Sequence, residues 1–269
     1  MIIIGEKING AIPSVKQAIA DRNADLIRQR ASMQAAAGAN FIDCAASTAP
    51  DLEYDAMVWL IGLIQEVTDT PICIDSPNAK LLARLIEEGH VNKPGMVNSV
   101  NEEGDKCETI FPLIAGTDWN VVGLTCDKDG IPTQVDKKVD IAKRIIEKAV
   151  KYGVALDHLH IDPCVMALST MPSAMKDFEE CIVRIHEYAP EVKMTGAISN
   201  ISFEMPARKY VNSNCMAYAI HAGLDSAIMD PCNVDIMSTI YACEALCMHD
   251  KGGRKYNRAY RQGKIGVKK

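Results

Sequence analysis

The sequence of 269 residues predicts an α/β protein that folds as a (βα)8 TIM barrel. Eight short apolar runs rich in Ile and Val recur along the chain, and amphipathic stretches lie between them. The runs do not alternate polar and apolar residues, which is typical of parallel strands buried on both faces. Eight strand and helix units in alternation fit a single barrel, a fold of about 250 residues.

The expected strands lie at residues 2–6, 40–45, 71–76, 95–100, 120–125, 158–163, 193–199 and 226–230. Amphipathic helices are expected at residues 14–38, 54–68, 135–153 and 233–249. The first of these ends on Gly38 and the third on Gly153, and glycine is a common C-terminal signal of a helix. A doubly wound sheet is the competing fold, but it usually has fewer strands. No GxGxxG or GxxxxGK[ST] motif follows any of the runs, so the nucleotide-binding folds lose support.

We expect one barrel domain over residues 1–250 and a basic C-terminal extension over residues 251–269, which contains no acidic residue. Such an extension is either solvated or packed against a partner subunit or an acidic protein. The formal net charge of −6 argues against a nucleic-acid-binding protein, which usually carries a basic excess. Hydrophobic residues make up 48% of the chain, enough for a sizeable core.

No apolar run reaches the roughly 18 residues that a membrane helix needs, and the N-terminus lacks the features of a signal peptide. A cytoplasmic protein without membrane segments is therefore expected. The ten cysteines lie among apolar residues and show no paired spacing. In a cytoplasmic chain of this size, most of them are expected to be buried thiols.

Polar side chains interrupt the apolar pattern where the strands end, which is where TIM barrels carry their chemistry. A ring of carboxylates and amides facing one mouth is better explained by a polar ligand than by solvent alone, because burying such groups without partners is costly. Any single member could instead cap the following helix, and this alternative is strongest for Asp43, Asp230 and Asn233. The ring consists of Glu6, Asn9, Asp43, Asp75, Asn98, Asp162, Ser199, Asn200, Asp230 and Asn233.

The chemistry of this ring indicates the kind of ligand. Basic residues near the strand ends are limited to Lys7 and Arg208, and no glycine-rich loop is present, so a phosphate site is not favoured. Carboxylates combined with Asn suit a heterocycle that presents N–H donors and ring acceptors along one edge, such as an aminopyrimidinone.

Metal binding is the main alternative for polar residues of this kind. The chain contains six histidines but neither an HExxH nor a CxxC motif. Cys243, Cys247 and His249 lie close together in sequence, yet two cysteines four residues apart on a helix are a common core pattern. His158 and His160 lie on one face of the sixth strand and are interpreted as ordinary barrel or surface histidines. We therefore expect no metal bound by this chain.

Nine short motifs, in order over about residues 1–250, resemble the methyltetrahydrofolate:corrinoid-protein methyltransferases. This family belongs to the pterin-binding barrels, together with dihydropteroate synthase and the folate domain of cobalamin-dependent methionine synthase. The motifs are IIGEKIN (3–9), FIDCAAS (41–47), CIDSPN (73–78), MVNSVNEE (96–103), IFPLIAG (110–116), VGLTCDKDGIP (122–132), HIDP (160–163), ISNIS (198–202) and GLDSAIMD (223–230).

The resemblance implies roles for single residues. The family's pterin-binding Asp of the third strand falls on Asp75, its Asn of the fourth strand on Asn98, and its Asp of the sixth strand on Asp162. The Asn after the seventh strand, which in the family reaches the N5 region of the pterin, falls on Asn200, and the following Arg falls on Arg208.

Glu6, Asp43 and Ser199 complete the expected pterin-binding set, and Asn200 with Asp162 are the expected catalytic residues. The chain departs from the family at Ala197, where a Gly is common, and at Asn233, where others have an acidic residue.

The resemblance also implies methyl transfer, in either direction, between N5 of 5-methyltetrahydrofolate and the cobalt of a corrinoid. The chain lacks the Asp-x-His-x-x-Gly signature of a tight cobalamin-binding module, so the corrinoid is expected on a partner protein that docks over the barrel mouth. The metabolic settings expected for such an enzyme are one-carbon metabolism, O-demethylation, and methylamine or betaine metabolism. The helices over residues 210–223 and 233–249 carry excess apolar surface, which predicts a homodimer.

Two other functions stay open from the sequence. A dihydropteroate synthase-like enzyme would need basic residues at the mouth for a pyrophosphate leaving group and a different first motif. A non-catalytic folate-binding component of a corrinoid complex would share the same pterin site, and only an assay of methyl transfer separates it from an enzyme.

Overall fold

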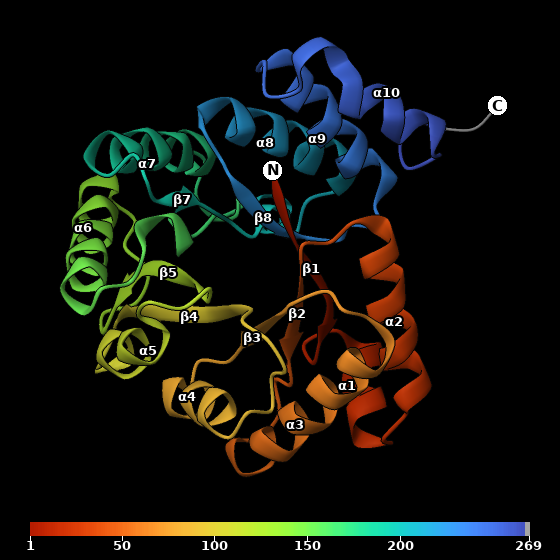
Figure 1. Cartoon of the computed structure of the whole chain (residues 1–269). Coiled ribbons are helices and arrows are strands. Elements are labelled where there is room, and N and C mark those ends of the chain that lie inside the picture. The colour runs from red at the N-terminus through yellow and green to blue at the C-terminus, as the bar shows by residue number, and fades with distance from the viewer. Residues whose placement is uncertain (267–269) are drawn as a thin grey trace.

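A computed structural model describes residues 1–266 of the chain. Eight parallel strands form one sheet in the order β7-β6-β5-β4-β3-β2-β1-β8, and helices surround it on the outside (Figure 1). The predicted (βα)8 barrel is therefore confirmed. The strands are β1 (Ile2–Asn9), β2 (Phe41–Ala45), β3 (Ile72–Asp75), β4 (Met96–Glu102), β5 (Asn120–Asp127), β6 (Leu159–Asp162), β7 (Lys193–Met194) and β8 (Ser226–Met229).

The helices are α1 (Pro13–Ala20), α2 (Ala24–Ala37), α3 (Pro50–Val67), α4 (Ala79–Glu87), α5 (Lys106–Ile114), α6 (Val135–Tyr152), α7 (Ala174–Tyr188), α8 (Arg208–Ala222), α9 (Val234–Leu246) and α10 (Arg254–Arg261). Their apolar faces pack against the outside of the barrel in one continuous core. A smaller cluster fills the inside of the barrel below its mouth and includes Ile4, Cys73, Met96 and Val122, all fully buried. The interior between the strands is thus packed, and the carboxyl ends of the strands are left to line a cavity above it.

The barrel closes between β7 and β8 through a few backbone hydrogen bonds. The N–H of Asp225 donates to the Met194 carbonyl at 3.0 Å, and the N–H of Ile228 donates to the Gly196 carbonyl at 3.0 Å. The expected strand over residues 193–199 was too long, because β7 ends at Met194 and the chain then forms a short 3-10 helix, η2 (Ile198–Ser202). This early end of β7 brings residues 198–202 to the mouth.

The expected helix over residues 14–38 is two helices. Arg22 adopts a left-handed conformation with φ of 52°, which ends α1, and Asn23 caps α2 by accepting a hydrogen bond from the N–H of Leu26. Gly38 ends α2 and Gly153 ends α6, both in the left-handed conformation that glycine adopts at little cost.

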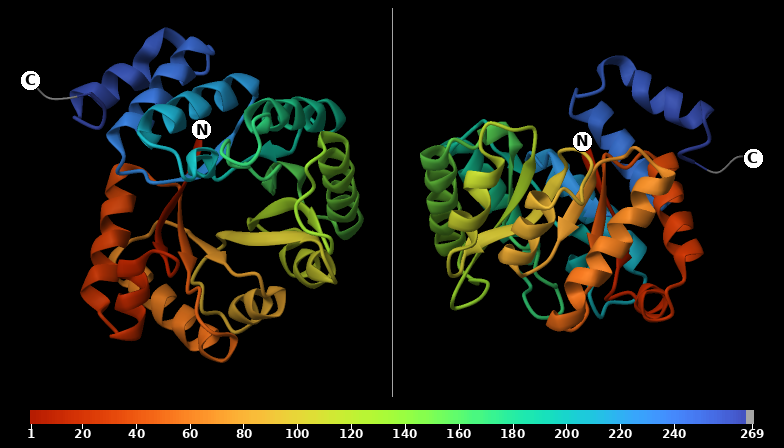
Figure 2. Two further views of the ribbon diagram at one scale, coloured as in Figure 1. Left: turned by 180° about the vertical axis from the view of Figure 1, so that it is seen from behind. Right: turned by 60° about the horizontal axis from the view of Figure 1, so that its bottom comes forward.

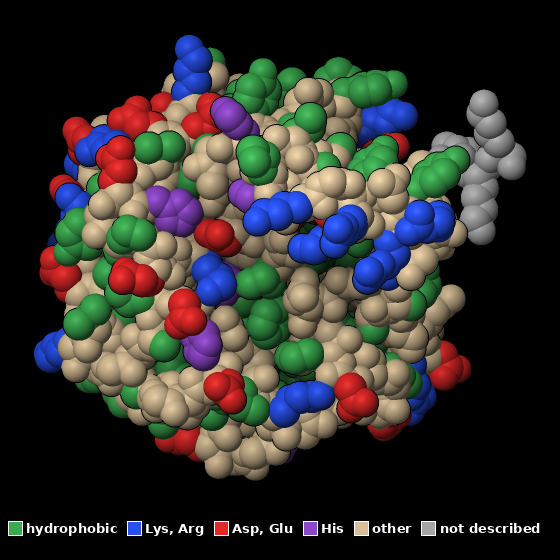
Figure 3. Space-filling view, turned by 45° about the horizontal axis from the view of Figure 1, so that its top comes forward, with side chains coloured by type: hydrophobic (Ala, Val, Ile, Leu, Met, Phe, Trp, Pro, Cys, Tyr) green, Lys and Arg blue, Asp and Glu red, His purple; other side chains and the backbone are tan. Residues whose placement is uncertain are grey.

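The described part of the extension packs against the barrel's own helices. Figure 2 shows α10 outside the ring of helices, next to α9. Ala259 and Ile265 are buried there, and the N–H of Gly266 donates to the Ser238 hydroxyl on α9 at 3.2 Å. A row of Lys and Arg side chains lies on the side of the molecule where α10 lies (Figure 3). Residues 267–269 of the expected extension lie outside the described residues.

His160 is a fully buried residue of the barrel interior. Its Nδ1 lies 2.7 Å from the Ser226 hydroxyl, and its Nε2 lies 3.2 Å from Oδ1 of Asn120. Burial lowers its pKa to about 3, so the ring is neutral and links β5, β6 and β8 through its hydrogen bonds.

Across the described helices, none combines the length and the apolar character that a membrane span requires.

Candidate functional site

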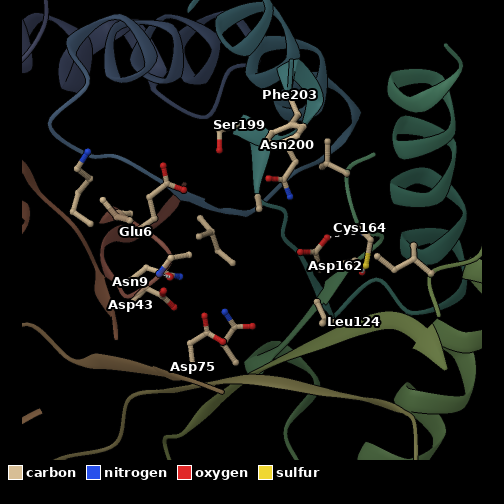
Figure 4. A pocket seen from close by; sticks show the side chains of 18 of the residues that line it. Glu6, Asn9, Asp43, Asp75, Leu124, Asp162, Cys164, Ser199, Asn200 and Phe203 are labelled. Carbon is tan, nitrogen blue, oxygen red and sulfur yellow. Dashed lines mark hydrogen bonds between the residues drawn. The ribbon is translucent and has the colours of Figure 1, made fainter. Parts of the chain in front are cut away.

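A cavity of about 880 Å³ opens at the carboxyl ends of the strands. Figure 4 shows side chains from opposite sides of the barrel pointing into it. The eight residues predicted from the sequence to bind or act on a ligand all line this one cavity. They are Glu6, Asp43, Asp75, Asn98, Asp162, Ser199, Asn200 and Arg208.

The floor of the cavity on one side is formed by polar residues of the neighbouring strands β2, β3 and β4. Asp75 on β3 is the register partner of Asn98 on β4, while Asp43 on β2 lies opposite Cys73, two residues before Asp75. Asp43 is buried, and its Oδ1 has no hydrogen-bond partner within residues 1–266. A buried carboxylate oxygen without a partner is costly. Such an oxygen is expected where a ligand with N–H donors completes the site.

Burial makes these carboxyl groups weaker acids than exposed aspartates, because it raises their pKa. It raises the pKa of Asp75 to about 7, with a further contribution from the charge of Glu53, and it raises the pKa of Asp43, with a contribution from Asp75. Because the charge of Asp75 raises the pKa of Asp43, ionising both carboxyl groups together is unfavourable. A ligand edge that presents several N–H donors would favour their ionised forms.

Glu6 faces the cavity from the second half of β1 (Figure 4). Burial, and next the charge of Asp230, raise its pKa to about 7. Asp230 does not line the cavity. Its Oδ2 pairs with Nζ of Lys7 at 3.2 Å, and its Oδ1 accepts from the N–H of Cys232 at 2.9 Å.

Asn233 does cap a helix. Its Oδ1 accepts from the N–H groups of Asp235 and Ile236 at the start of α9, at 3.1 and 3.3 Å. It is absent from the residues that line the main cavity. The capping alternative considered from the sequence therefore describes Asn233.

Asp162 ends β6 on the far side of the cavity from Glu6. Its Oδ1 accepts from the N–H of Cys164 at 2.7 Å, which leaves its other oxygen for the cavity. Burial raises the pKa of Asp162 to about 6, and the Cys164 N–H and the charge of Lys138 act in the opposite direction. At neutral pH this group is largely ionised and is a competent proton acceptor.

Asn200 lies on η2, with its backbone N–H bonded to the Ala197 carbonyl at 3.1 Å. Its exposed side chain points into the cavity (Figure 4). Arg208 holds this segment from α8, because its Nη2 donates to the Ser199 carbonyl at 2.7 Å and its Nε donates to the Ser202 hydroxyl at 2.9 Å. The Asn200 amide can donate or accept a hydrogen bond at a ligand atom.

Sequence reasoning missed the apolar part of the wall and one buried cation. Leu124, Ile131, Phe203 and Ile228 line the cavity, and Phe203 and Ile131 are exposed at its rim. In the sequence these four residues are apolar residues in a loop or near a strand end. Such residues are common in any chain, so they did not indicate a cavity. Lys138 is buried beneath the loop that follows Asp162, and its position in an amphipathic helix gave no hint of burial.

Within residues 1–266, no group of three or more His, Cys, Asp or Glu side chains is arranged to hold a metal ion. Cys243 is buried in the core, and Cys247 packs at its edge. The structure therefore supports the interpretation of Cys243 and Cys247 as residues of the hydrophobic core.

Comparisons with known proteins show which proteins this chain is similar to. A methylcorrinoid:tetrahydrofolate methyltransferase of Eubacterium limosum is 47% identical over 268 residues, which cover 99% of this chain and 98% of that protein. The methionine synthase of Mycobacterium leprae is 31% identical over 242 residues, which cover 85% of this chain but 20% of that protein.

Solved structures of dihydropteroate synthase share the fold. The Yersinia pestis enzyme with a pterine-sulfa conjugate superposes with a TM-score of 0.66 at 16% identity, covering 93% of this chain and 94% of that chain. The Xanthomonas albilineans enzyme with 7,8-dihydropteroate gives a TM-score of 0.63 at 17% identity, covering 91% and 92%. The pterin binding enzyme family matches residues 9–230. The predicted resemblance is confirmed, and the chain belongs to the pterin binding enzyme family.

Proposed function

We propose that this protein is an enzyme that transfers a methyl group between the cobalt of a corrinoid, carried by a partner protein, and N5 of tetrahydrofolate. The observation that carries this proposal is the near-complete alignment with the Eubacterium limosum methyltransferase, at 47% identity, combined with one cavity that gathers the eight candidate residues. The name of that relative runs from methylcorrinoid to tetrahydrofolate, and we propose this direction here.

The pterin ring would lie across the polar floor of the cavity. Asp75 and Asp43 would accept hydrogen bonds from its amino and ring N–H groups, and the Asn98 amide beside Asp75 would hold a ring acceptor. The unpartnered Oδ1 of Asp43 supports a ligand that brings donors to this place. These contacts fix the ring so that N5 faces Asn200 and Asp162 on the other side of the cavity.

The reaction requires N5 to change charge at the moment of transfer. Its lone pair forms the new N–CH3 bond, the cobalt–carbon bond breaks with its electron pair left on cobalt, and the N5 proton departs. The Asn200 side chain would hydrogen-bond N5 as this charge changes, and ionised Asp162 would receive the proton directly or through water. The corrinoid supplies the methyl group and its leaving group, and the protein supplies position and electrostatics.

The partner protein would present its corrinoid at the rim of the mouth. Phe203 and Ile131 leave 58% and 46% of their surface exposed there, and Phe203 directly follows the segment η2 that holds Asn200. Exposed apolar side chains at a cavity mouth suit a large, flat macrocycle better than they suit water. The fold binds the folate, and the corrinoid stays with its carrier.

The alternative of a dihydropteroate synthase-like activity has weaker support. Among the described residues that line the cavity, the cations are Lys7 and Arg208, and both are engaged. Lys7 pairs with Asp230, and Arg208 holds the Ser199 carbonyl. A pyrophosphate leaving group would need cations that are free to meet it. A non-catalytic folate-binding protein would bind the pterin at the same cavity floor. The methyl-transfer assay below distinguishes it from an enzyme.

We also propose a homodimer through the outer faces of α8 and α9. Tyr218, Leu246 and Met248 are more than half exposed there, and a shallow apolar depression lies between Tyr218, Cys243 and Leu246.

The ten cysteines are all free thiols, which suits a reducing compartment such as the cytoplasm. O-demethylation and methylamine or betaine metabolism are the settings in which we place the reaction.

The function is tested with methylcobalamin or a methylated corrinoid protein that carries a 13C-labelled methyl group. Under anaerobic conditions the enzyme and tetrahydrofolate should move the label to N5, where 13C NMR detects it, and omission of the enzyme should abolish the transfer. Tetrahydrofolate binding without any methyl transfer, from either methylcobalamin or the methylated corrinoid protein, would indicate the non-catalytic role. Absence of binding would overturn the proposal.

A further inference from the structure

Lys138 is a buried lysine that contacts the backbone instead of a carboxylate. It lies in the first turn of α6, and 2% of the residue is exposed. Its Nζ donates to the carbonyl of Pro163 at 2.6 Å and to the carbonyl of Cys164 at 3.0 Å. Buried ammonium groups are costly and are usually paired with a carboxylate, but none of the ion pairs within residues 1–266 involves Lys138.

The loop that Lys138 holds begins at the candidate catalytic residue Asp162. The N–H of Cys164 turns back to donate to Oδ1 of Asp162 at 2.7 Å, and this turn places Cys164 at φ of 59°. A left-handed conformation is costly for a residue with a side chain and persists only where surrounding contacts enforce it. The two bonds from Lys138 fix the peptide groups on both sides of this turn, and so they fix the direction in which Asp162 faces the cavity.

The charge of Lys138 also acts on Asp162. Among the described residues, Lys138 from α6 acts on both Asp162 and Cys164, and Cys126 from β5 acts on Cys164. Cys181 from α7 lies near Lys138. Burial raises the pKa of each of the three thiols, so they stay neutral. Among the described residues, Lys138 is therefore the charged group that opposes the effect of burial on the Asp162 carboxyl.

We propose that Lys138 is a positioning residue for the methyl transfer: its buried ammonium holds the turn at residues 162–164 and keeps Asp162 ionised at the cavity. This inference rests on the proposed function, because it takes Asp162 to be the group that meets the pterin. Lys138 itself does not line the cavity, and it acts through the Pro163 and Cys164 carbonyls.

The test is the titration of Asp162 in the ligand-free protein. With 13Cγ-labelled aspartate, and with the signal assigned by its loss in Asp162→Asn, the wild-type carboxyl should titrate near pH 6. Lys138→Met should move this midpoint upward by about one pH unit, because the charge that favours the ionised form is gone. Lys138→Arg should restore much of the shift. Lys137→Met, at the exposed neighbouring lysine of the same helix, should leave the midpoint unchanged.

A structural role alone predicts lower thermal stability for Lys138→Met with the Asp162 midpoint unchanged, and this result would overturn the proposal. If Lys138→Met does not fold, the 15Nζ signal of Lys138 in the wild type decides. It should show an inflection near pH 6 that is absent from Asp162→Asn, and a signal without that inflection would overturn the proposal.

The acid limb of tetrahydrofolate binding also contains contributions from Asp75 and Glu6, so in Lys138→Met it should move in the same direction as the Asp162 midpoint, by a smaller amount. An acid limb that stays in place while the midpoint moves would overturn the role of Lys138 in the site. A wild-type protein that binds no tetrahydrofolate at any pH would overturn the proposed function, and the titration of the ligand-free protein would still decide whether Lys138 keeps Asp162 ionised.

Discussion

Asp75 and Asn98 are register partners on the neighbouring parallel strands β3 and β4, so a carboxyl group and an amide lie side by side at the floor of the cavity. This pairing presents acceptors and a donor along one line. It suits the edge of a flat heterocycle that carries both kinds of group. The arrangement has a cost in the empty protein, because the pKa of Asp75 is raised to about 7 by burial and by the charge of Glu53.

The first prediction follows from that cost. The Asp75 carboxyl has a higher pKa in the folded protein than in the unfolded chain, so the folded state binds more protons between about pH 4 and 7, and stability falls as the pH rises through this window. Asp75→Asn should therefore raise the free energy of unfolding at pH 8 by at least ~1 kcal/mol, which corresponds to a melting temperature about 2–4 °C higher.

The gain from Asp75→Asn should shrink toward pH 4, where the wild-type carboxyl is protonated in the folded state and partly protonated in the unfolded chain. Asp69→Asn, at an exposed position just before β3, is the matched control and should change little at either pH. Thermal melts from pH 4 to 8 measure both variants. A melting temperature of Asp75→Asn that lies below the wild-type value at pH 8 would mean that Asp75 stabilises the empty fold.

The second prediction concerns pterin affinity. Asp75→Ala and Asp162→Ala should each weaken the binding of tetrahydrofolate by about 1.5–3 kcal/mol, the loss of a hydrogen bond to a charged group. Isothermal titration calorimetry under anaerobic conditions measures it. Asp118→Ala, at an exposed site before β5 at the other end of the barrel, should bind as the wild type does. Unchanged tetrahydrofolate affinity in both variants would contradict the assignment of Asp75 and Asp162 as residues that bind the edge of the pterin ring.

The third prediction concerns the assembly. Light scattering at micromolar protein should give about twice the chain mass, and Tyr218→Glu, which places a charge on the apolar face of α8, should give the monomer. Tyr188→Glu on α7 is a matched control, because Tyr188 is also an exposed tyrosine and lies away from α8 and α9 on the ring of helices. A wild-type protein of monomer mass would contradict the homodimer.

The sequence predicted the barrel well because a parallel sheet buried on both faces leaves a strong local signal, eight apolar runs rich in Ile and Val. It predicted the cavity residues through the same rule, since polar residues that end parallel strands share one mouth. The runs were less informative where tertiary contacts decide the backbone. The run over residues 193–199 reads as a strand, yet it forms a two-residue strand followed by η2, because this part of the chain must close the barrel and also hold Asn200 at the mouth.

Lys138 shows a second limit of the sequence. Its neighbours alternate apolar and charged residues at helical spacing, so a lysine there is expected on the solvated face. The partners that bury it, the Pro163 and Cys164 carbonyls, lie 25 and 26 residues away and exist only in the folded chain. The left-handed Cys164 likewise has no local signal, because cysteine is not a residue that favours this conformation.

A single-turnover reaction of wild type and Asn200→Ala under anaerobic conditions tests the proposed methyl transfer directly. Each enzyme is mixed with a methylated corrinoid protein and tetrahydrofolate, and the absorbance of the corrinoid is followed as cobalt loses its methyl group. Asn200→Ala should react about 10²–10³-fold more slowly, with a smaller change in tetrahydrofolate affinity, because its amide acts where N5 changes charge. Asn257→Ala, at an exposed residue of α10, should react at the wild-type rate. A folded Asn200→Ala enzyme within a few-fold of the wild-type rate would contradict this account.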